Sequence, residues 1–424
     1  MPAPGGPERI TRTAKESRMS SSLTALHPSS VLTVSVLTEV AALEALAPAW
    51  GRLLEASASN EPVLSPVWLL TWWRVYGTGS GRRLRAVAFR DGERLVGLAP
   101  LLWRRYWYSP GIPFRRLEPL GADVDEGDGV CSDYLNVLAE RGAEGAVARA
   151  LAEALAGGAL GGWDEFVLPV MDGEAAMPRL LMAALAEAGL EARCEQTNVA
   201  PYTPLPASWD TYLRALPKKK RYGIVRALRD FETWADGTAA LRRASTRAEL
   251  EEGKHVLAAL HNERLEAAGR AGAFRSPRFA AFHDAVLPQL LDAGALDLLW
   301  LTVRGEPVAA IYDLVWNNKV YFYQCGRKAD APRGQRLGVV MVAYALRAAV
   351  ESGRREFDAL AGASLYKSQL LPAARPLVQV RAARRSFREW LRRAAERGIA
   401  GARSLRNALR AARGRGAPAV ETME

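Results

Sequence analysis

Hydrophobic positions along the chain follow helical and strand spacings, and one ordered set of these spacings occurs twice. Residues 65–77 (SPVWLLTWWRVYG) and 276–291 (SPRFAAFHDAVLPQLL) have apolar residues at helical spacing, and each segment begins with Ser-Pro. The serine hydroxyl suits the cap of a helix because it accepts a backbone N–H, and proline suits the first position because its missing N–H costs nothing there. The pattern therefore predicts a capped helix in each half of the chain.

A β-hairpin is predicted after each of these helices. Residues 84–103 and 298–316 each contain two apolar runs, with turns centred on Gly92 and Gly305. The turn glycine follows the capping serine by 27 residues in the first half and by 29 in the second. This order and spacing indicate duplication of a domain of roughly 170–200 residues. Coincidence between two generic α/β segments is the alternative.

The remaining pattern alternates strands with helices, which is typical of βαβ units and a mixed sheet. We predict an α/β protein (α+β mixed sheet), with such a sheet in each half. The predicted strands are 133–138, 163–170, 191–205, 319–325 and 356–361, and the predicted helices are 142–156, 175–189, 218–232 and 337–353.

Composition and charge divide the chain further. We predict a disordered N-terminus (1–30), two domains (31–204 and 205–382) and an arginine-rich helical tail (383–424). Residues 381–415 hold twelve arginines against two glutamates, so most of the net charge of +11 lies there and the body is nearly neutral. This argues against DNA as a partner. An apolar stripe in the tail predicts peripheral contact with an anionic membrane or a protein, with docking on the second domain as the alternative.

Cysteines and histidines give no sign of a metal site. The three cysteines have no CxxC spacing and the four histidines form no HExxH motif, so we expect no metal. An odd number of widely spaced cysteines fits a reducing, cytoplasmic location. The sequence contains no run of 18 apolar residues, so we predict no membrane-spanning helix.

A candidate phosphate-binding loop lies between the strand 319–325 and the following helix. This segment, RKADAPRGQRLGVVM (327–341), joins a strand to a helix N-terminus, whose unpaired amides and dipole favour anions. Its residues resemble motif A of the GNAT acetyltransferases, although Arg336 replaces the central glycine. Solvated arginines on a surface loop are the alternative. The predicted donor-binding residues are Arg333, Gly334, Gln335, Arg336, Leu337 and Gly338.

The order of several motifs over residues 40–375 resembles the CelD-like, FemAB-related acetyltransferases of the GNAT superfamily. These motifs include SPVWLLTWW, LPKKKRYGIVRALRDFE, LHNERLEAAG and FDALAGASLYKSQL. The resemblance implies tandem GNAT-like domains with a C-terminal basic helical tail. It also implies transfer of an acyl group from acetyl-CoA or another acyl-CoA to a glycan, envelope or lipid-related acceptor. Fem enzymes use aminoacyl-tRNA instead, and carry a similar aromatic-lysine element.

By that resemblance, Tyr366 and Lys367 face the reaction centre. Acyl transfer from a thioester passes through an oxyanion, which the Lys367 ammonium would stabilise, or else Lys367 would contact a donor phosphate. Tyr366 would protonate the leaving thiolate. A surface lysine beside a tyrosine that only packs is the structural alternative. Asp358 is the predicted general base, and pairing with an arginine is the alternative for it. Asp313 raises the same question, whereas His261 and Cys325 are expected to be structural.

Three other functions are consistent with the sequence. A Fem-like transferase would take its acyl group from aminoacyl-tRNA, and tRNA is a partner only in this alternative. A non-catalytic accessory protein of exopolysaccharide or cellulose synthesis would keep the fold without binding a donor. A peripheral membrane adaptor would depend on the basic tail.

Overall fold

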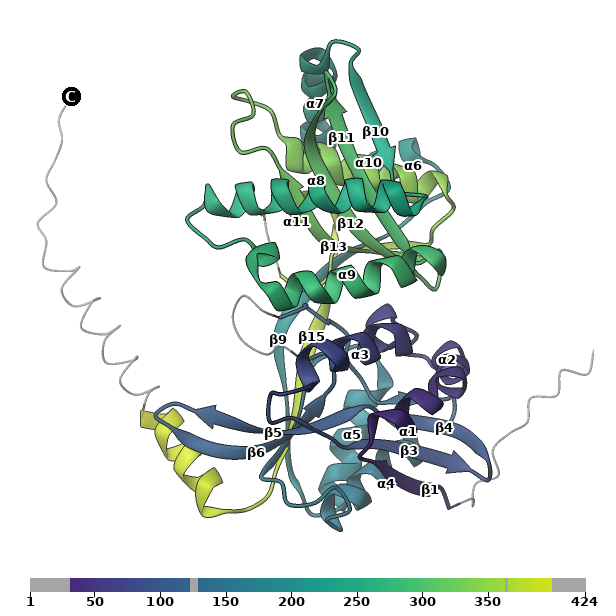
Figure 1. Ribbon diagram of the computed structural model, residues 1–424, viewed down its shortest axis with the longest axis vertical. Helices are drawn as coiled ribbons and strands as arrows, with labels where there is room; N and C mark the ends of the chain where they lie inside the picture. The colour runs from purple at the N-terminus through teal and green to yellow at the C-terminus, as the bar shows by residue number, and fades with distance from the viewer. Residues whose placement is uncertain (1–30, 123–128, 363–364, 399–424) are drawn as a thin grey trace, which may run out of the picture. The chain divides into compact units, whose positions relative to one another are not determined.

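The computed structural model describes residues 31–122, 129–362 and 365–398 (Figure 1). The described residues from Leu32 onward belong to one compact unit. The predicted disordered segment 1–30 lies outside the described residues, as does the part of the predicted tail beyond residue 398. We call residues 32–190 the N-terminal lobe and residues 205–370 the C-terminal lobe.

The N-terminal lobe contains a four-stranded antiparallel sheet in the order β1-β3-β4-β7. These strands are β1 Thr33–Leu37, β3 Ala86–Asp91, β4 Arg94–Ala99 and β7 Leu138–Ala139. Its helices are α1 Val40–Ala45, α2 Ala47–Ala56, the 3-10 turn η1 Pro62–Leu64, α3 Pro66–Trp72 with its π-helical extension η2 Trp73–Gly77, α4 Glu144–Ala156 and α5 Ala176–Glu187.

A second sheet has eleven strands and includes residues from both lobes. Its order is β10-β11-β12-β13-β14-β9-β15-β8-β6-β5-β2, and only the pairs β13–β14 and β6–β8 are parallel among the described residues. The strands are β2 Arg83–Leu84, β5 Leu101–Tyr108, β6 Ile112–Pro119, β8 Glu165–Asp172, β9 Glu191–Pro204, β10 Ala239–Arg243, β11 Leu296–Val303, β12 Glu306–Trp316, β13 Lys319–Arg327, β14 Glu356–Asp358 and β15 Ala373–Ala383.

Helices cover both faces of this sheet in the C-terminal lobe. Apolar residues of α7 and α10 form one core with β11, β12 and β13, and those of α8 and α9 form another core on the opposite face. The helices are α6 Trp209–Ala215, α7 Lys218–Ala235, α8 Arg247–Glu266, the 3-10 turn η3 Ala273–Arg275, α9 Pro277–Asp292, α10 Leu337–Glu351 and α11 Leu365–Leu370. The predicted mixed α/β class is confirmed.

The repeated Ser-Pro helices and hairpins are also confirmed. The Ser65 hydroxyl accepts from the Trp68 amide at the start of α3, and the Ser276 hydroxyl accepts from the Phe279 amide at the start of α9; both distances are 3.2 Å. The β3–β4 and β11–β12 hairpins turn at Gly92 (φ +58°) and Gly305 (φ +81°), where the left-handed conformation favours glycine.

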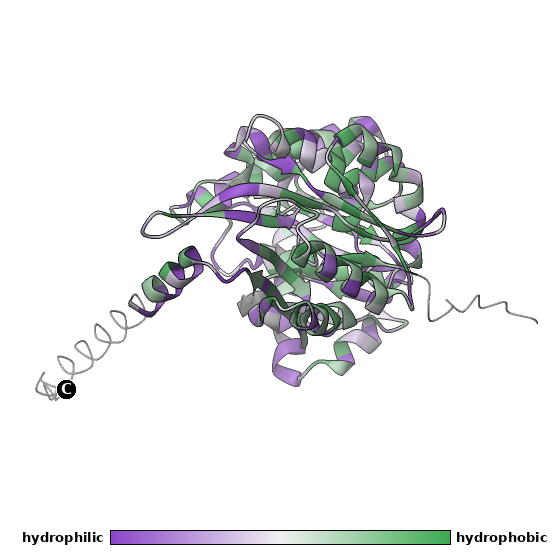
Figure 2. Cartoon of the chain, turned by 90° about the horizontal axis from the view of Figure 1, so that it is seen from below, coloured by the Kyte–Doolittle hydropathy of each residue, from purple (hydrophilic) through white to green (hydrophobic). Residues whose placement is uncertain are grey.

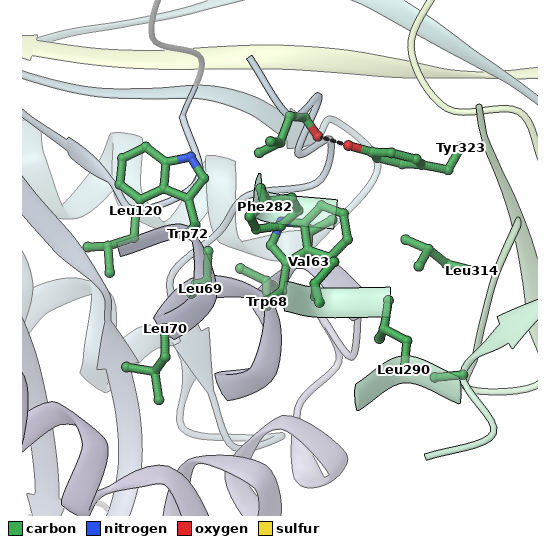
Figure 3. Packing of buried hydrophobic residues seen from close by; sticks show 14 of the residues in the cluster. Val63, Trp68, Leu69, Leu70, Trp72, Leu120, Phe282, Leu290, Leu314 and Tyr323 are labelled. Carbon is green, nitrogen blue, oxygen red and sulfur yellow. Dashed lines mark hydrogen bonds between the residues drawn. The ribbon is translucent and has the colours of Figure 1, made fainter. Parts of the chain in front are cut away.

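The two capped helices pack against each other, which joins the lobes (Figures 1 and 3). The ring of Trp68 lies edge-on to Phe282 at a centroid distance of 4.9 Å and to Tyr323 at 5.4 Å. Such aromatic pairs contribute about 0.5–1.5 kcal/mol beyond the burial of their area. The indole N–H of Trp68 also donates to the Ser132 hydroxyl at 3.0 Å, so α3 fixes the loop 129–137 as well.

Several segments differ from the sequence-based prediction. Of the predicted strand 133–138, only Leu138 belongs to a strand, because the preceding loop contains left-handed residues at Cys131 (φ +44°) and Tyr134 (φ +69°). The predicted strand 356–361 ends at Asp358, since Leu360 is also left-handed (φ +55°). The hairpin β5–β6 and the strand β15 were not predicted, and β15 makes the eleven-stranded sheet continuous between the lobes.

Most helices carry hydrophilic residues among their hydrophobic ones (Figure 2). None of the helices in the described part of the chain is long and apolar enough to cross a bilayer.

Asp313 is buried in β12 without compensation. Its side chain is 1% exposed, and neither carboxyl oxygen has a hydrogen-bond partner among the described residues. Asp313 lies directly opposite Asp297 of β11. Burial, with the Asp297 charge as a second cause, raises the pKa of Asp313 well above its usual value. At a pH where the unfolded chain would ionise the Asp313 carboxyl, its burial therefore lowers the free energy of unfolding.

We expect Asp313→Asn to stabilise the protein above the pKa of an unfolded aspartate. In that range the folded state keeps a proton that the unfolded chain releases, so the stability of the wild type falls as pH rises, and the variant removes this dependence. The expected gain is roughly 1–2 kcal/mol at about pH 8, and little at about pH 4. Urea unfolding at both pH values measures it. Asp330→Asn, at an exposed position, is the control. An equal gain at both pH values would contradict this explanation.

Candidate active site

A pocket of about 500 Å³ lies where α10 begins, and we call it the α10 pocket. Four predicted donor-binding residues line it, namely Gln335, Arg336, Leu337 and Gly338. Arg333 and Gly334 form the preceding turn, with φ +93° at Gly334, and are not among the lining residues. The second part of the predicted loop therefore lines the α10 pocket, and the first part lies outside its lining.

The start of α10 has amides available to an anion. Arg336 occupies the N-cap position, and no side chain of the described residues caps the helix. Within the first turn the Val339 amide donates to the Arg336 carbonyl, so the amides before Val339 are the donors available to a phosphate. The Arg336 side chain turns back to donate to the Gly223 carbonyl at 3.2 Å and to Gln369 Oε1 at 2.6 Å. The arginine that replaces the motif glycine thus ties α10 to α7 and α11.

Three further cations line the α10 pocket and were missed from the sequence: Arg264, Arg270 and Arg327. The first two lie more than sixty residues before α10 in the chain. They reach it because α8 approaches β13 closely: a Cβ added to Gly326 would lie 2.5 Å from the His261 amide nitrogen. The glycine after Cys325 was the one sequence signal of this approach.

A second pocket, of about 630 Å³, lies between residues of the two lobes, and we call it the interlobe pocket. Its polar lining includes Cys131, Ser132 and Asp133 from the N-terminal lobe and Gln324 from β13. Leu265 and Arg270 line both this pocket and the α10 pocket. The two cavities are therefore neighbours.

Lys367 is not among the lining residues of either pocket, but it interacts electrostatically with at least one lining residue of each. Its ammonium donates to the carbonyl oxygens of Ala359 at 2.7 Å and Ala361 at 3.2 Å. Burial lowers the pKa of Lys367, and Asp133, Cys325, Asp358 and Cys131 oppose this effect, in that order. Cys131 lines the interlobe pocket and Cys325 lines the α10 pocket.

One carboxylate from each lobe holds the segment that positions Lys367. The Asp133 carboxylate accepts from the Ala361 amide at 2.6 Å, and Asp358 accepts from the Leu360 amide at 2.7 Å. These bonds hold the left-handed turn at Leu360, so that the carbonyls on either side of it point to the lysine. We call residues 358–361 the lysine clamp.

Asp358, predicted as the general base, is fully buried at 0% exposure. Its second oxygen accepts from the Tyr134 hydroxyl at 2.6 Å and from the Arg375 guanidinium at 2.8 Å. Burial raises the pKa of Asp358, although these partners and the Leu360 amide act in the opposite direction. The arginine pairing considered from the sequence is therefore present. The side chain of Tyr366 lies outside the described residues, and its backbone belongs to α11.

His261 is held in a structural role. Its Nδ1 lies 2.9 Å from the Cys325 carbonyl, to which it donates, and its Nε2 accepts from the Ala273 amide at 3.4 Å. This arrangement requires a neutral ring, and burial lowers the pKa of His261 to about 4. Among the described residues, no three His, Cys, Asp or Glu side chains form a group that could hold a metal ion.

Comparison with known proteins finds a family match within the C-terminal lobe. Residues 218–368 match the family described as an acetyltransferase (GNAT) domain. No curated protein matches the sequence.

Solved structures resemble most of the chain. FemX aligns with a TM-score of 0.54 at 11% identity, covering 82% of this chain and 96% of that chain. L-PGS from Bacillus licheniformis aligns with a TM-score of 0.45 at 13% identity, covering 81% of this chain and 94% of that chain. A tandem GNAT protein from the clavulanic acid biosynthesis pathway aligns with a TM-score of 0.42 at 14% identity, covering 84% of this chain and 99% of that chain. Of these three, the match to FemX shows a shared fold.

The α10 pocket, where the uncapped helix and the arginines meet, lies within the matched GNAT region. Residues 218–368 are thus similar to a GNAT acetyltransferase domain, within a chain that shares the fold of FemX, and this supports an acyltransferase enzyme.

Proposed function

We propose that the protein transfers an acyl group, acetyl in the simplest case, from acyl-CoA to an amine or hydroxyl of an acceptor in the interlobe pocket. The observation that carries the proposal is the shared wall of the two pockets. Leu265 and Arg270 line both, so a donor in one cavity and an acceptor in the other would lie next to each other.

The residues of the α10 pocket fit the phosphates of coenzyme A. Arg264, Arg270 and Arg327 provide positive charge, and the uncapped start of α10 provides backbone amides. The Gln335 side-chain oxygen is buried and has no partner among the described residues, so it can accept from a polar group of the donor. Val339 and Met341 supply apolar surface for the rest of the molecule.

Lys367 is the residue that we propose for catalysis. When bound, acyl-CoA supplies a thioester whose carbonyl accepts a nucleophile. The Lys367 ammonium, held by two carbonyls of the lysine clamp, provides a fixed positive charge for an oxyanion. Tyr366 remains the predicted proton donor to the leaving thiolate. We assign Asp358 to positioning, because both of its oxygens are engaged and its side chain is fully buried.

The lining of the interlobe pocket favours a polar acceptor without a large net charge. Arg104 pairs with Glu118 and Arg116 with Glu165, so these charges balance, and the side-chain amides of Gln324 and Gln379 also line the pocket. Amides of this kind bind hydroxyl and amine groups, as a saccharide presents. We therefore propose a glycan acceptor, a CelD-like role in polysaccharide synthesis and a cytoplasmic location.

Transfer from aminoacyl-tRNA is the second candidate. The fold shared with FemX favours it, since Fem enzymes use this donor. The exposed basic start of α7, at Lys218 and Lys219, offers charge for an RNA phosphate. Donor binding distinguishes the two candidates, because a tRNA-dependent enzyme has no need of coenzyme A.

We expect acetyl-CoA to bind the wild type and to lose affinity when charge is reversed at the α10 pocket. Arg327→Glu should weaken binding on the order of tenfold or more, because it places a carboxylate near the donor phosphates. Arg333→Glu, outside the pocket lining, should have a smaller effect. Calorimetric titration measures both.

Arg278→Glu is the matched control, since Arg278 is an exposed arginine of α9 outside the α10 pocket. Absence of binding to the wild type at millimolar acetyl-CoA would remove this donor. Binding of charged tRNA to the same preparation would then support the second candidate.

Lys367→Ala should lower kcat by about 10²–10³-fold, the range found when one oxyanion donor is removed. The dissociation constant for acetyl-CoA should stay within about threefold of the wild type, because the α10 pocket is retained. Steady-state kinetics and titration measure the two quantities. Lys219→Ala, at an exposed lysine of α7, is the control. Unchanged turnover in Lys367→Ala would exclude the proposed role.

Asp133→Asn should shift the alkaline limb of the pH–rate profile. Four groups oppose the burial that lowers the pKa of Lys367: Asp133, Cys325, Asp358 and Cys131. Asparagine still accepts from the Ala361 amide but lacks the charge of Asp133, so the ammonium is lost at lower pH. We expect the alkaline limb to move to lower pH.

The comparison variant is Tyr134→Phe, which removes the hydrogen bond to Asp358 and leaves the Asp133 charge in place. Tyr134→Phe should change turnover without moving the alkaline limb of the pH–rate profile as Asp133→Asn does. If Asp133→Asn leaves the alkaline limb unmoved while Lys367→Ala is inactive, Lys367 acts without electrostatic support from Asp133.

A further inference from the structure

Two exposed aromatic rings stand together on the helix that follows β15. This helix covers residues 387–398 within the described part of the chain. Phe387 is 71% exposed and Trp390 is 57% exposed, and their rings stack at 5.6 Å with an interplanar angle of 16°. Residues three apart lie on the same side of a helix, so the rings form one apolar patch.

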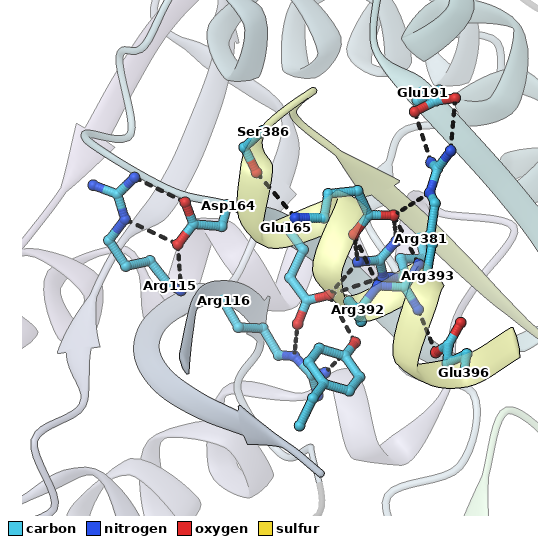
Figure 4. A network of polar contacts seen from close by, with 12 residues as sticks. Arg115, Arg116, Asp164, Glu165, Glu191, Arg381, Ser386, Arg392, Arg393 and Glu396 are labelled. Atoms are coloured by element: carbon cyan, nitrogen blue, oxygen red, sulfur yellow. Dashed lines mark hydrogen bonds and ion pairs between the residues drawn. The ribbon is translucent and has the colours of Figure 1, made fainter. Parts of the chain in front are cut away.

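The opposite side of the helix is fixed to the body by a buried ion-pair network (Figure 4). Glu389 is buried and accepts from Arg381 and Arg392 at 2.7 Å and from Arg393 at 2.8 Å. Burial opposes ionisation of this carboxyl, but hydrogen bonds from the three arginines lower its pKa. Arg393 also reaches Glu191 of β9 at 2.6 Å.

The network determines which side of the helix faces outward. Leu391, Ala394 and Ala395 are partly buried, whereas Phe387 and Trp390 remain exposed. The apolar stripe in the sequence is therefore divided by the structure into an inner part and an outer pair of rings. Because the helix is anchored by several charge-assisted bonds, it holds this orientation.

The segment that carries the two rings has an excess of positive charge. Residues 381–398 contain seven arginines and two glutamates. Both glutamates are engaged by arginines, Glu389 as above and Glu396 by Arg392. Arg385, Arg388 and Arg397 are exposed. Arg388 pairs with Asp164 at 2.9 Å, which leaves the outward charge with Arg385 and Arg397 in excess.

We propose that Phe387 and Trp390, with Arg385 and Arg397, form a docking surface for a bilayer rich in anionic phospholipid. Aromatic rings of this kind lie at the level of the lipid headgroups, and arginine guanidinium groups bind the phosphates around them. The ion-pair network keeps the rings outward in the absence of lipid. This surface contains no lining residue of the α10 pocket or the interlobe pocket, so it is separate from both.

Charge complementarity favours lipid over a protein partner. A bilayer with anionic headgroups suits both the aromatic rings and the arginines, because it offers an apolar layer beneath a negatively charged surface. Two rings alone are a small apolar area for a stable protein interface, which buries about 800 Å² on each partner.

Vesicle flotation with the full chain tests the proposal. The probe is vesicles of about three parts phosphatidylcholine to one part phosphatidylglycerol, compared with phosphatidylcholine alone. We expect the wild type to float with the anionic vesicles only, and the doubly substituted Phe387→Ala, Trp390→Ala chain to bind on the order of tenfold more weakly. Tyr222→Ala removes a 62% exposed ring beside the basic start of α7 and should bind like the wild type.

A second variant separates charge from apolar contact. Arg385→Glu with Arg397→Glu keeps both rings and should also lose binding, more strongly at low salt than at high salt. Circular dichroism checks that each variant is folded. Three results would overturn the proposal: equal flotation with both vesicle types, unchanged flotation of the ring variant, or no flotation of the wild type. Concentration-dependent self-association of the wild type that the ring variant lacks, without flotation, would assign the surface to a second copy.

Discussion

The burial of Trp68 between the two repeated helices is the interaction on which the other features of the site depend. Its ring contacts Phe282 of α9 and Tyr323 of β13, and its indole N–H holds Ser132 in the loop 129–137. That loop carries Asp133 and Tyr134, whose side chains reach the lysine clamp of the other lobe. A single buried ring therefore links the helix contact, the wall of the interlobe pocket and the position of Lys367. Truncation of such a ring in a core costs about 3–5 kcal/mol.

The candidate site combines residues that neither lobe supplies alone. The GNAT-like lobe contributes the α10 pocket and Lys367, and the N-terminal lobe contributes the carboxylate that holds the clamp. Lys367 is also subject to opposing effects, since burial disfavours its charge while Asp133 and Asp358 favour it. The ammonium is thus held in a partly dehydrated place, where a fixed charge acts more strongly on an oxyanion than it would in water.

Local signals in the sequence predicted the elements that local physics determines. The Ser-Pro caps, the glycine turns and the helical spacing of α7, α9 and α10 all rest on neighbouring residues, and these elements are present. The loop 129–137 could not be predicted, because its apolar residues are buried without forming a strand, and hydrogen bonds from Trp68 and Tyr323 hold it instead. Arg264 and Arg270 were missed for a similar reason: only the close contact of α8 with Gly326 brings them to α10.

The position of β15 has a consequence for the order in which the protein is assembled. This strand lies between β8 and β9, and pairs with both over most of its length. A nascent chain that has passed residue 204 already contains β8 and β9, but the strand that joins them is synthesised only after the whole C-terminal lobe. The two strand edges must therefore wait with unpaired backbone groups, which exposes them to pairing with other chains. The pairing of β15 with β8 and β9 is consequently possible only after the C-terminal lobe has been synthesised.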